Sequence, residues 1–68
     1  MIVKTGDFLE REGKVYEVIV CDACIFVIGE VIYDENEKRR YTSFENLEAY
    51  SNDETVNTLA DLKFTIKN

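Results

Sequence analysis

The chain has 68 residues, 46% of them apolar, and carries eight basic against fourteen acidic side chains, for a net charge of −6. This length allows a single domain, residues 1–68, which buries only about 60% of the surface that its unfolded chain exposes. The apolar share excludes a disordered chain. It does not indicate a membrane span, because Glu17, Asp22 and Glu30 interrupt the longest apolar run.

The composition also argues against several functions. The acidic excess disfavours ordinary nucleic-acid binding, since such proteins gain affinity by neutralising phosphates with Lys and Arg. There is no histidine to act as a general base, and the three glycines are too isolated to form a phosphate-binding loop. We therefore expect no catalytic activity and no cofactor. The opening MIVKTGDF has no long apolar core of a secretory signal, and the two cysteines then favour a reducing, cytoplasmic location.

The first third of the chain has the features of a β-hairpin. The segment IVKTGDFLEREGKVYEV predicts two strands joined by a tight turn, with Gly13 at the left-handed position of a three- or four-residue loop. Gly6 and Asp7 are expected to break or bend the first strand. The stretch GDFLEREGKVYEV resembles the first hairpin of SH3-like small β-barrel modules, in which Gly-Asp precedes one strand and Gly-Lys opens the next. The resemblance implies an architecture and carries over no functional residue.

Residues 15–33 are the most apolar region, and nine of these nineteen residues are Val or Ile, which fit a pleated sheet. Alternation predicts two strands that turn these side chains toward the core: Tyr16, Val18 and Val20, then Ile25, Val27, Gly29, Val31 and Tyr33. The opposite faces still carry four large apolar residues: Ile19, Phe26, Ile28 and Ile32. Because exposed apolar patches mark partner surfaces, these four residues are the predicted surface for another protein or for a homodimer. Aspartate at Phe26 or Ile28 is then expected to disrupt association and leave the fold intact.

The two cysteines lie between the two strands. Asp22 and Ala23 are expected to be the central residues of a hairpin turn, which would place Cys21 and Cys24 opposite each other as small structural thiols. A redox pair would need a helix N-terminus after Cys21, and IFVIGEVIY provides none. One chain cannot supply the four ligands of a structural zinc. The alternative is a dimer in which both copies contribute Cys21 and Cys24 to one zinc ion.

The second half of the chain is more mixed. Residues 34–38 predict a polar turn, and residues 39–42 a strand. Capping-box patterns at residues 42–45 and 51–54 predict one or two short helical turns within residues 43–61, the second with Val56, Leu59 and Ala60 turned inward. Alternation of Leu62, Phe64 and Ile66 with polar residues predicts a last strand. The whole is expected to be mainly β, with about five short antiparallel strands forming a small SH3-like barrel or a curled sheet.

Two charged segments give alternative hypotheses. Residues 41–62 contain no Lys or Arg and carry five carboxylates that could mimic nucleic acid and inhibit a nucleic-acid-processing protein: Glu45, Glu48, Asp53, Glu54 and Asp61. Residues 38–41, Lys-Arg-Arg-Tyr, have the composition of an RNA-contacting edge, although pairing with acids of the preceding turn also explains them. The preferred hypothesis is a small acidic regulatory module that binds an unidentified protein.

Overall fold

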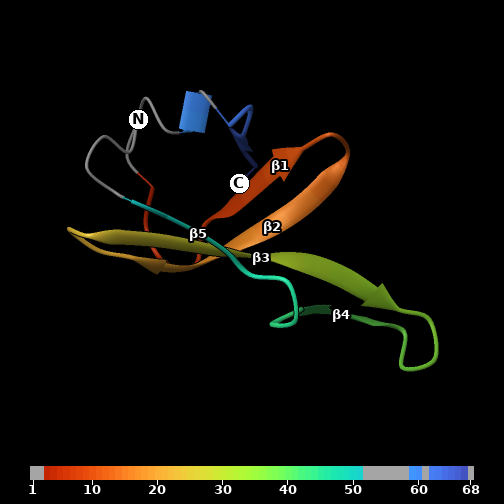
Figure 1. Cartoon of the computed structure of the whole chain (residues 1–68). Coiled ribbons are helices and arrows are strands. Elements are labelled where there is room, and N and C mark those ends of the chain that lie inside the picture. The colour runs from red at the N-terminus through yellow and green to blue at the C-terminus, as the bar shows by residue number, and fades with distance from the viewer. Residues whose placement is uncertain (1–2, 52–58, 61, 68) are drawn as a thin grey trace.

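The structure, a computed structural model, describes residues 3–51, 59–60 and 62–67. These residues form one antiparallel sheet of six strands (Figure 1). The strands are β1 (Phe8–Arg11), β2 (Lys14–Cys21), β3 (Ile25–Asp34), β4 (Arg39–Thr42), β5 (Glu48–Ser51) and β6 (Thr65–Ile66). The prediction of a mainly β chain with about five antiparallel strands is confirmed, and β4 has the bounds expected from the sequence.

The sheet has the order β4-β3-β2-β1-β6, and β5 pairs with β3 beside β4. The two short strands share one edge of β3, because β5 pairs with residues 25–28 and β4 with residues 31–34. The second half of β3 and β4 therefore form an arm that projects from the rest of the sheet (Figure 1). Among the described strands, β4 and β6 end the sheet without pairing to each other, so the sheet does not close into a barrel.

The sheet is nevertheless strongly curled. Three strand spacings separate β1 from β5, which would be about 14 Å in a flat sheet. Arg11 on β1 nevertheless forms an ion pair with Glu48 on β5, with 2.8 Å between Nη2 and Oε2. The guanidinium also lies 4.3 Å from the ring centre of Phe64. The alternative of a curled sheet, rather than a closed barrel, is thus the one that forms.

The turns follow from local side-chain chemistry. Arg11 pairs with Lys14, so Glu12 and Gly13 form a two-residue loop, and their φ values of 53° and 79° are those of a type I′ hairpin turn. Gly13 takes the left-handed position that the sequence predicts, but the expected loop of three or four residues is wrong. At the β3–β4 turn, the Asp34 carboxylate accepts hydrogen bonds from the backbone N–H groups of residues 36 and 37.

The core lies on the concave side of the curl, here called the inner face. Its fully or almost fully buried apolar residues are Val3, Leu9, Tyr16, Val18, Phe26, Ile28, Leu59 and Phe64. The C-terminal segment covers this face (Figure 1), where Phe64 meets Tyr16 edge to face with ring centres 5.4 Å apart. Burial of one such side chain contributes about 1.5–3 kcal/mol, which makes this covered face the main source of stability.

The face assignment predicted for β3 is wrong. Phe26 and Ile28 are 1% and 0% exposed, whereas Ile25 and Tyr33 are exposed. The assignment rests on alternation with Glu30, whose charge indicates a solvent-facing side, but Glu30 lies where β3 leaves the core. A charge there does not report which face of the preceding residues is covered. Aspartate at Phe26 or Ile28 would therefore place a charge in the core rather than on a surface.

Val20 is also wrongly predicted to face the core, and a β-bulge explains the error. Val18 pairs with Ile28 but Val20 pairs with Val27, so one extra residue, Ile19, interrupts the register. The extra residue reverses the alternation in β2 from that point. As a result Val20 is exposed, while Cys21 packs against the core.

The helical predictions are partly wrong. Residues 43–47 form no helix: the Ser43 hydroxyl accepts a hydrogen bond from the backbone N–H of Glu45, and the chain enters β5 at Glu48. Leu59 and Ala60 do lie in a helical turn, where Leu59 is buried but Ala60 is exposed. The cap predicted at residues 51–54 and the inward position of Val56 fall on residues 52–58, outside the described ranges, although Ser51 itself ends β5. The predicted last strand is reduced to β6, which pairs with β1.

Candidate interaction surface

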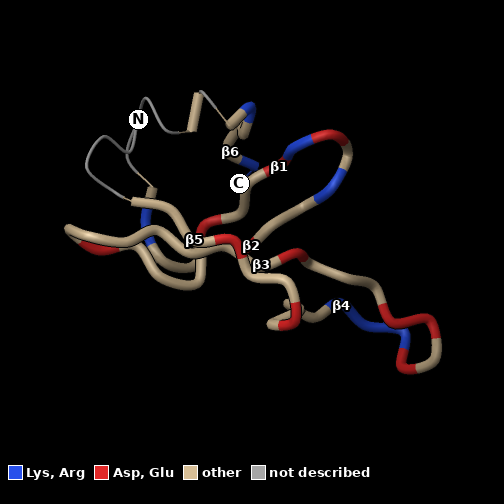
Figure 2. Tube along the Cα trace, in the orientation of Figure 1, with Lys and Arg blue, Asp and Glu red and all other residues tan. Residues whose placement is uncertain are grey.

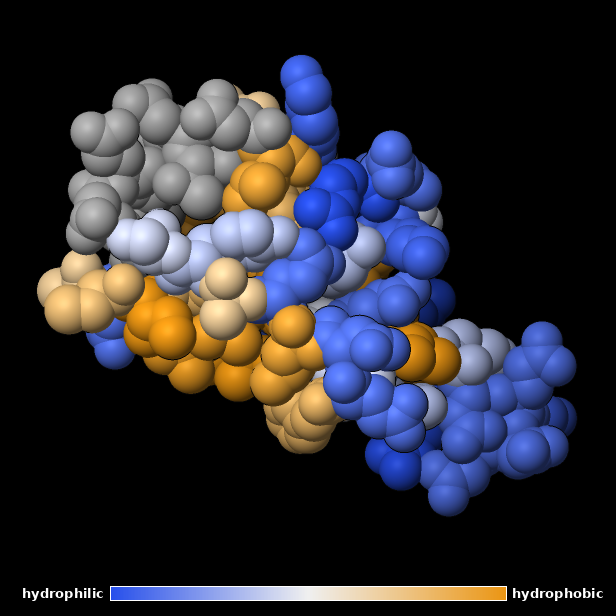
Figure 3. All heavy atoms as spheres, in the orientation of Figure 1, coloured by the Kyte–Doolittle hydropathy of each residue, from blue (hydrophilic) through white to orange (hydrophobic). Residues whose placement is uncertain are grey.

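The convex side of the sheet, here called the outer face, carries many apolar side chains. Cross-strand pairing places Val20 beside Val27, and alternation along β3 extends this face to Val31 and Tyr33. Its apolar members are Phe8, Val15, Ile19, Val20, Ile25, Val27, Val31 and Tyr33, all of them half-buried or exposed. Figure 3 shows apolar side chains along the β2–β3 hairpin and a polar end at the β3–β4 turn.

The predicted surface of four residues is only partly placed on this outer face. Ile19 lies there and is half-buried. Phe26 and Ile28 belong to the core. Ile32 is half-buried on the same side of β3 as Phe26, but beyond the core in the projecting arm, where it pairs with Tyr41. The surplus of apolar residues inferred from the sequence therefore exists as an uncovered face, but most of its members are different residues.

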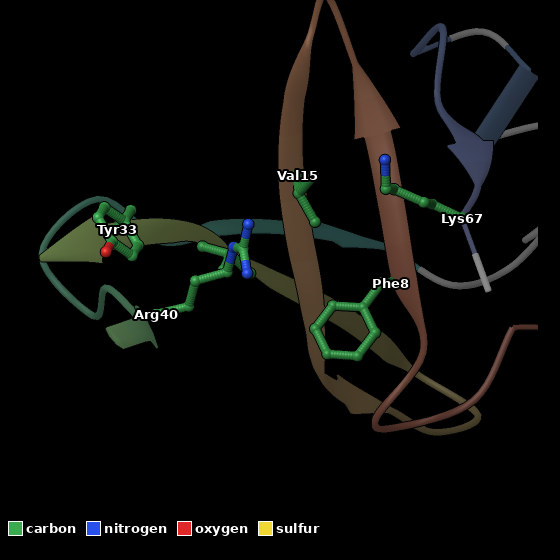
Figure 4. Close-up of a pocket in the computed structure, with 6 residues that line it drawn as sticks. Phe8, Val15, Tyr33, Arg40 and Lys67 are labelled. Atoms are coloured by element: carbon green, nitrogen blue, oxygen red, sulfur yellow. The ribbon is translucent and has the colours of Figure 1, made fainter. Parts of the chain in front are cut away.

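A groove with a volume of about 390 Å³ lies on the outer face, where the arm meets β1 and β2. Its lining residues come from five strands or their ends: Phe8, Val15, Val31, Tyr33, Arg40 and Lys67. In Figure 4 the side chain of Arg40 extends from β4 toward Val15, and the ring of Phe8 lies next to Val15. Lys67 lies beyond Phe8, on the other side of β1. The groove thus has an apolar middle and a cation at each side.

The two cations of the groove differ in their surroundings. Lys67 forms an exposed ion pair with Glu10, with 3.1 Å between Nζ and Oε2. The Arg40 guanidinium lies over the ring of Tyr33, 5.9 Å from its centre, and has no carboxylate partner within the described ranges 3–51, 59–60 and 62–67. Tyr33 is 52% exposed, so this stacked pair is open to solvent. Arg40 is therefore available to bind an anion.

Tight packing over Gly29 anchors the arm to the outer face. A Cβ atom at Gly29 would lie 2.8 Å from the backbone oxygen of Ser43 and 2.9 Å from Ile19 Cδ1. The Thr42 hydroxyl donates a hydrogen bond to the half-buried Glu17 carboxylate at the same place. Only glycine leaves room for the chain to cross here, and the crossing fixes where residues 42–43 pass over β3.

The sequence does not reveal the groove. Phe8 and Leu9 are adjacent and both apolar, which indicates that both faces of β1 are apolar but does not say which one is covered. No local sequence pattern marks Val15, Arg40 and Lys67 as lining residues, because they come together only after the sheet has formed. The one usable signal is the excess of apolar residues over what a single covered face needs.

The structure changes the predicted arrangement of the cysteines. Cys21 pairs with Phe26 rather than facing Cys24, since the turn spans residues 22–25 and is closed by a hydrogen bond from the backbone N–H of Asp22 to the carbonyl oxygen of Ile25. The Asp22 carboxylate accepts hydrogen bonds from the N–H groups of Cys24 and Ile25, which lower the pKa of Asp22 below its ordinary value. Cys21 is half-buried and donates to the Val3 carbonyl oxygen, whereas Cys24 is exposed. The predicted fold-back between β2 and β3 is confirmed, but no disulfide joins these two thiols.

The structure gives little support to the acidic nucleic-acid mimic, to the RNA-contacting edge or to a metal site. Of the five acidic residues of the predicted nucleic-acid mimic, Glu45 is exposed and Glu48 is paired with Arg11, while Asp53, Glu54 and Asp61 lie outside the described residues. Figure 2 shows the described acidic residues spread over several strands and hairpin ends rather than gathered at one place. Arg39 of the basic segment pairs with Glu37 of its own turn. In the described part of the chain, no group of three or more Cys, Asp or Glu is arranged to hold a metal ion.

Comparison with known proteins adds no family to these observations. No family model, no curated protein and no solved structure matches the chain. The resemblance of the first hairpin to SH3-like modules therefore stays a prediction. Within the residues that the structure describes, no helix is long and apolar enough to cross a membrane.

Proposed function

We propose that this protein is a small regulatory module that binds another protein through the outer face of its sheet and has no catalytic activity. The observation that carries the proposal is that the sheet has two apolar faces and that, among the described residues, the C-terminal segment covers only one of them. The C-terminal segment covers the inner face, whereas Val15, Val31 and Tyr33 line an open groove on the other. Apolar surfaces of this kind mark sites of protein association.

The composition of the outer face fits a protein partner. Aromatic residues and arginine are enriched at interface centres, and the groove combines Phe8, Tyr33 and Arg40 with two valines. The tight packing at Gly29 means that the face is largely pre-formed, so little ordering opposes binding. We place this activity in the cytoplasm, because an exposed Cys24 and a half-buried Cys21 suit a reducing compartment.

Affinity capture with outer-face variants tests the proposal. The wild-type protein and Tyr33→Ser are used to capture partners from the native cell, and the bound proteins are identified by mass spectrometry. Tyr41→Ser is the matched control, because Tyr41 is 41% exposed but pairs with Ile32 on the opposite side of the arm. We expect one protein to be captured by the wild type and by Tyr41→Ser and lost with Tyr33→Ser.

Two further results would favour the acidic mimic or the zinc-bridged dimer over the proposal. Capture that survives Tyr33→Ser but is lost in moderate salt would indicate the acidic nucleic-acid mimic instead, since screening weakens exposed charge contacts. Zinc in the purified protein at half an equivalent per chain, lost with Cys24→Ser, would indicate the zinc-bridged dimer. Either result would contradict binding through the outer face.

A further inference from the structure

We infer that the groove on the outer face binds a peptide segment of a partner protein in which a large apolar side chain neighbours one or two carboxylates. This inference rests on the proposed function and specifies the chemistry of the ligand. The apolar side chain would occupy the space between Phe8, Val15 and Val31, and a carboxylate would meet the guanidinium of Arg40. The combination of an apolar middle and flanking cations is the observation that defines this ligand.

The apolar part of the ligand follows from the size and lining of the groove. A volume of about 390 Å³ is at the lower end of the range for small-ligand sites, and it accommodates one or two side chains rather than a helix. Phe8 is 37% exposed, and Val15 and Val31 are half-buried, so an inserted ring or branched side chain would displace water from apolar surface. Such a site selects the apolar residue by shape.

The acidic part follows from Arg40. Its guanidinium carbon lies 5.9 Å from the ring centre of Tyr33, and the side chain extends across the groove toward Val15 (Figure 4). A guanidinium can bind a carboxylate through two parallel hydrogen bonds. Lys67, on the other side of Phe8, is held by Glu10 in an exposed pair that a second carboxylate could join. A cationic site in a chain of net charge −6 is a local exception to the overall charge.

The overall charge also limits the occupant. A polyanion such as RNA would meet the repulsion of the whole chain at every phosphate, and one arginine with one lysine does not offset that. A second copy of the chain would bring another charge of −6 and would place the same cations against each other. One or two carboxylates beside an apolar side chain satisfy Arg40 and incur much less long-range repulsion, which salt screens beyond about 8 Å.

Titration of isotope-labelled protein with three capped peptides, followed by amide NMR shifts, tests the inference. The first peptide alternates Phe with Asp, the second replaces each Asp by Asn, and the third replaces each Phe by Ala. We expect the first to shift the amides of Phe8, Val15, Val31 and Tyr33, to bind at millimolar concentration or below, and to bind at least about fivefold more tightly than either of the others.

Arginine variants give the matched control. Arg40→Gln should lower the affinity for the Phe/Asp peptide about fivefold and leave that for the Phe/Asn peptide unchanged. Arg39→Gln, on the adjacent residue that points to the other side of β4 and pairs with Glu37, should leave both unchanged. The folded state of each variant is checked by the unchanged dispersion of its amide spectrum.

Four results would overturn the inference. Equal binding of the Asp and Asn peptides at the groove would remove the acidic requirement, and the proposed function would stand with a purely apolar ligand. Tighter binding of oligouridine than of the Phe/Asp peptide, lost with Arg40→Gln, would assign the groove to RNA. Concentration-dependent shifts of the groove amides without any peptide would show that a second copy occupies it. If none of the peptides shifted the amide signals of the groove residues, the inference would also be contradicted. The proposed function is decided separately by the capture experiment.

Discussion

The inner and outer faces of the sheet are built from the same kinds of residue, yet they have different roles. On β3, Phe26 and Ile28 are fully buried beneath the C-terminal segment, while their neighbours Ile25 and Val27 lie on the outer face, which the described part of that segment does not cover. Hydrophobicity alone does not distinguish the two sets. The difference teaches that the cover, and not the strand, determines which apolar residues are core and which are surface.

The largest expected difference between the faces is in stability. Phe26→Ala should lower the free energy of unfolding by about 3–5 kcal/mol, because it leaves a cavity in the core. A chain of this length has a total stability on the order of 5 kcal/mol, so the variant should be largely unfolded. Val27→Ala, one residue along on the outer face, should cost about 1 kcal/mol. Urea denaturation followed by circular dichroism measures both, and equal losses would mean that the outer face is covered too.

A substitution at Gly29 tests how firmly the arm is held against the outer face. Gly29→Ala should destabilise the protein by about 1–3 kcal/mol, because the new Cβ would lie 2.8 Å from a backbone oxygen that cannot turn away. Gly13→Ala is the comparison: it has open space around it but a positive φ of 79°, and should cost about 1 kcal/mol. Thermal unfolding measures both. A stabilising Gly29→Ala, as unfolded-state entropy alone would give, would contradict the close crossing of residues 42–43 over β3.

At the rim of the inner face, Tyr50 makes stability sensitive to alkaline pH. Burial and then the hydrogen bond that its hydroxyl donates to Glu48 raise the pKa of Tyr50 above its ordinary value of 10.0. A group with a raised folded-state pKa contributes stability that is complete below the unfolded pKa and is lost as pH rises through the folded one. We therefore expect stability to fall as pH increases above 10, and to fall less steeply in Tyr50→Phe. Urea midpoints across this pH range test it, and parallel curves would show that Tyr50 does not contribute.

The smallest effect concerns the two cysteines at the end of the hairpin. Cys24→Ser should change the free energy of unfolding by no more than about 0.5 kcal/mol, because the thiol is exposed. Cys24 should also react faster with a thiol reagent than Cys21, which is half-buried and donates to the Val3 carbonyl oxygen. The reaction rates of the two single-cysteine variants measure this directly. Equal rates would indicate that Cys21 does not pack against the core.

The sequence was sufficient for those features that local chemistry controls. The left-handed position of Gly13, the polar turn after Asp34, the bounds of β4 and the fold-back between Cys21 and Ile25 each depend on a few adjacent residues. The faces of β3 could not be predicted in this way. They depend on the bulge at Ile19, which reverses the alternation in β2, and on a C-terminal segment that covers one side only.

Strand β5 and the groove could not be predicted from the sequence for a related reason. Residues 42–45 carry a capping pattern, but the Ser43 hydroxyl accepts a hydrogen bond from the Glu45 N–H, and residues 48–51 pair with β3 in the sheet. Phe8, Val31 and Lys67 come together only through the order of the strands. A site assembled from five strand ends has no motif in the sequence. The surplus of apolar residues predicted that a binding face exists without identifying its members.

The difference between the two faces can be measured most directly on the isolated protein in solution. A soluble paramagnetic relaxation agent broadens the NMR signals of exposed methyl groups and spares those of buried ones. The two-face account predicts strong broadening for Val27 and Val31 and protection for Val18 and Ile28. Protection of Val27 and Val31 in the monomer, or broadening of Ile28, would contradict it and would remove the surface on which the proposed function depends.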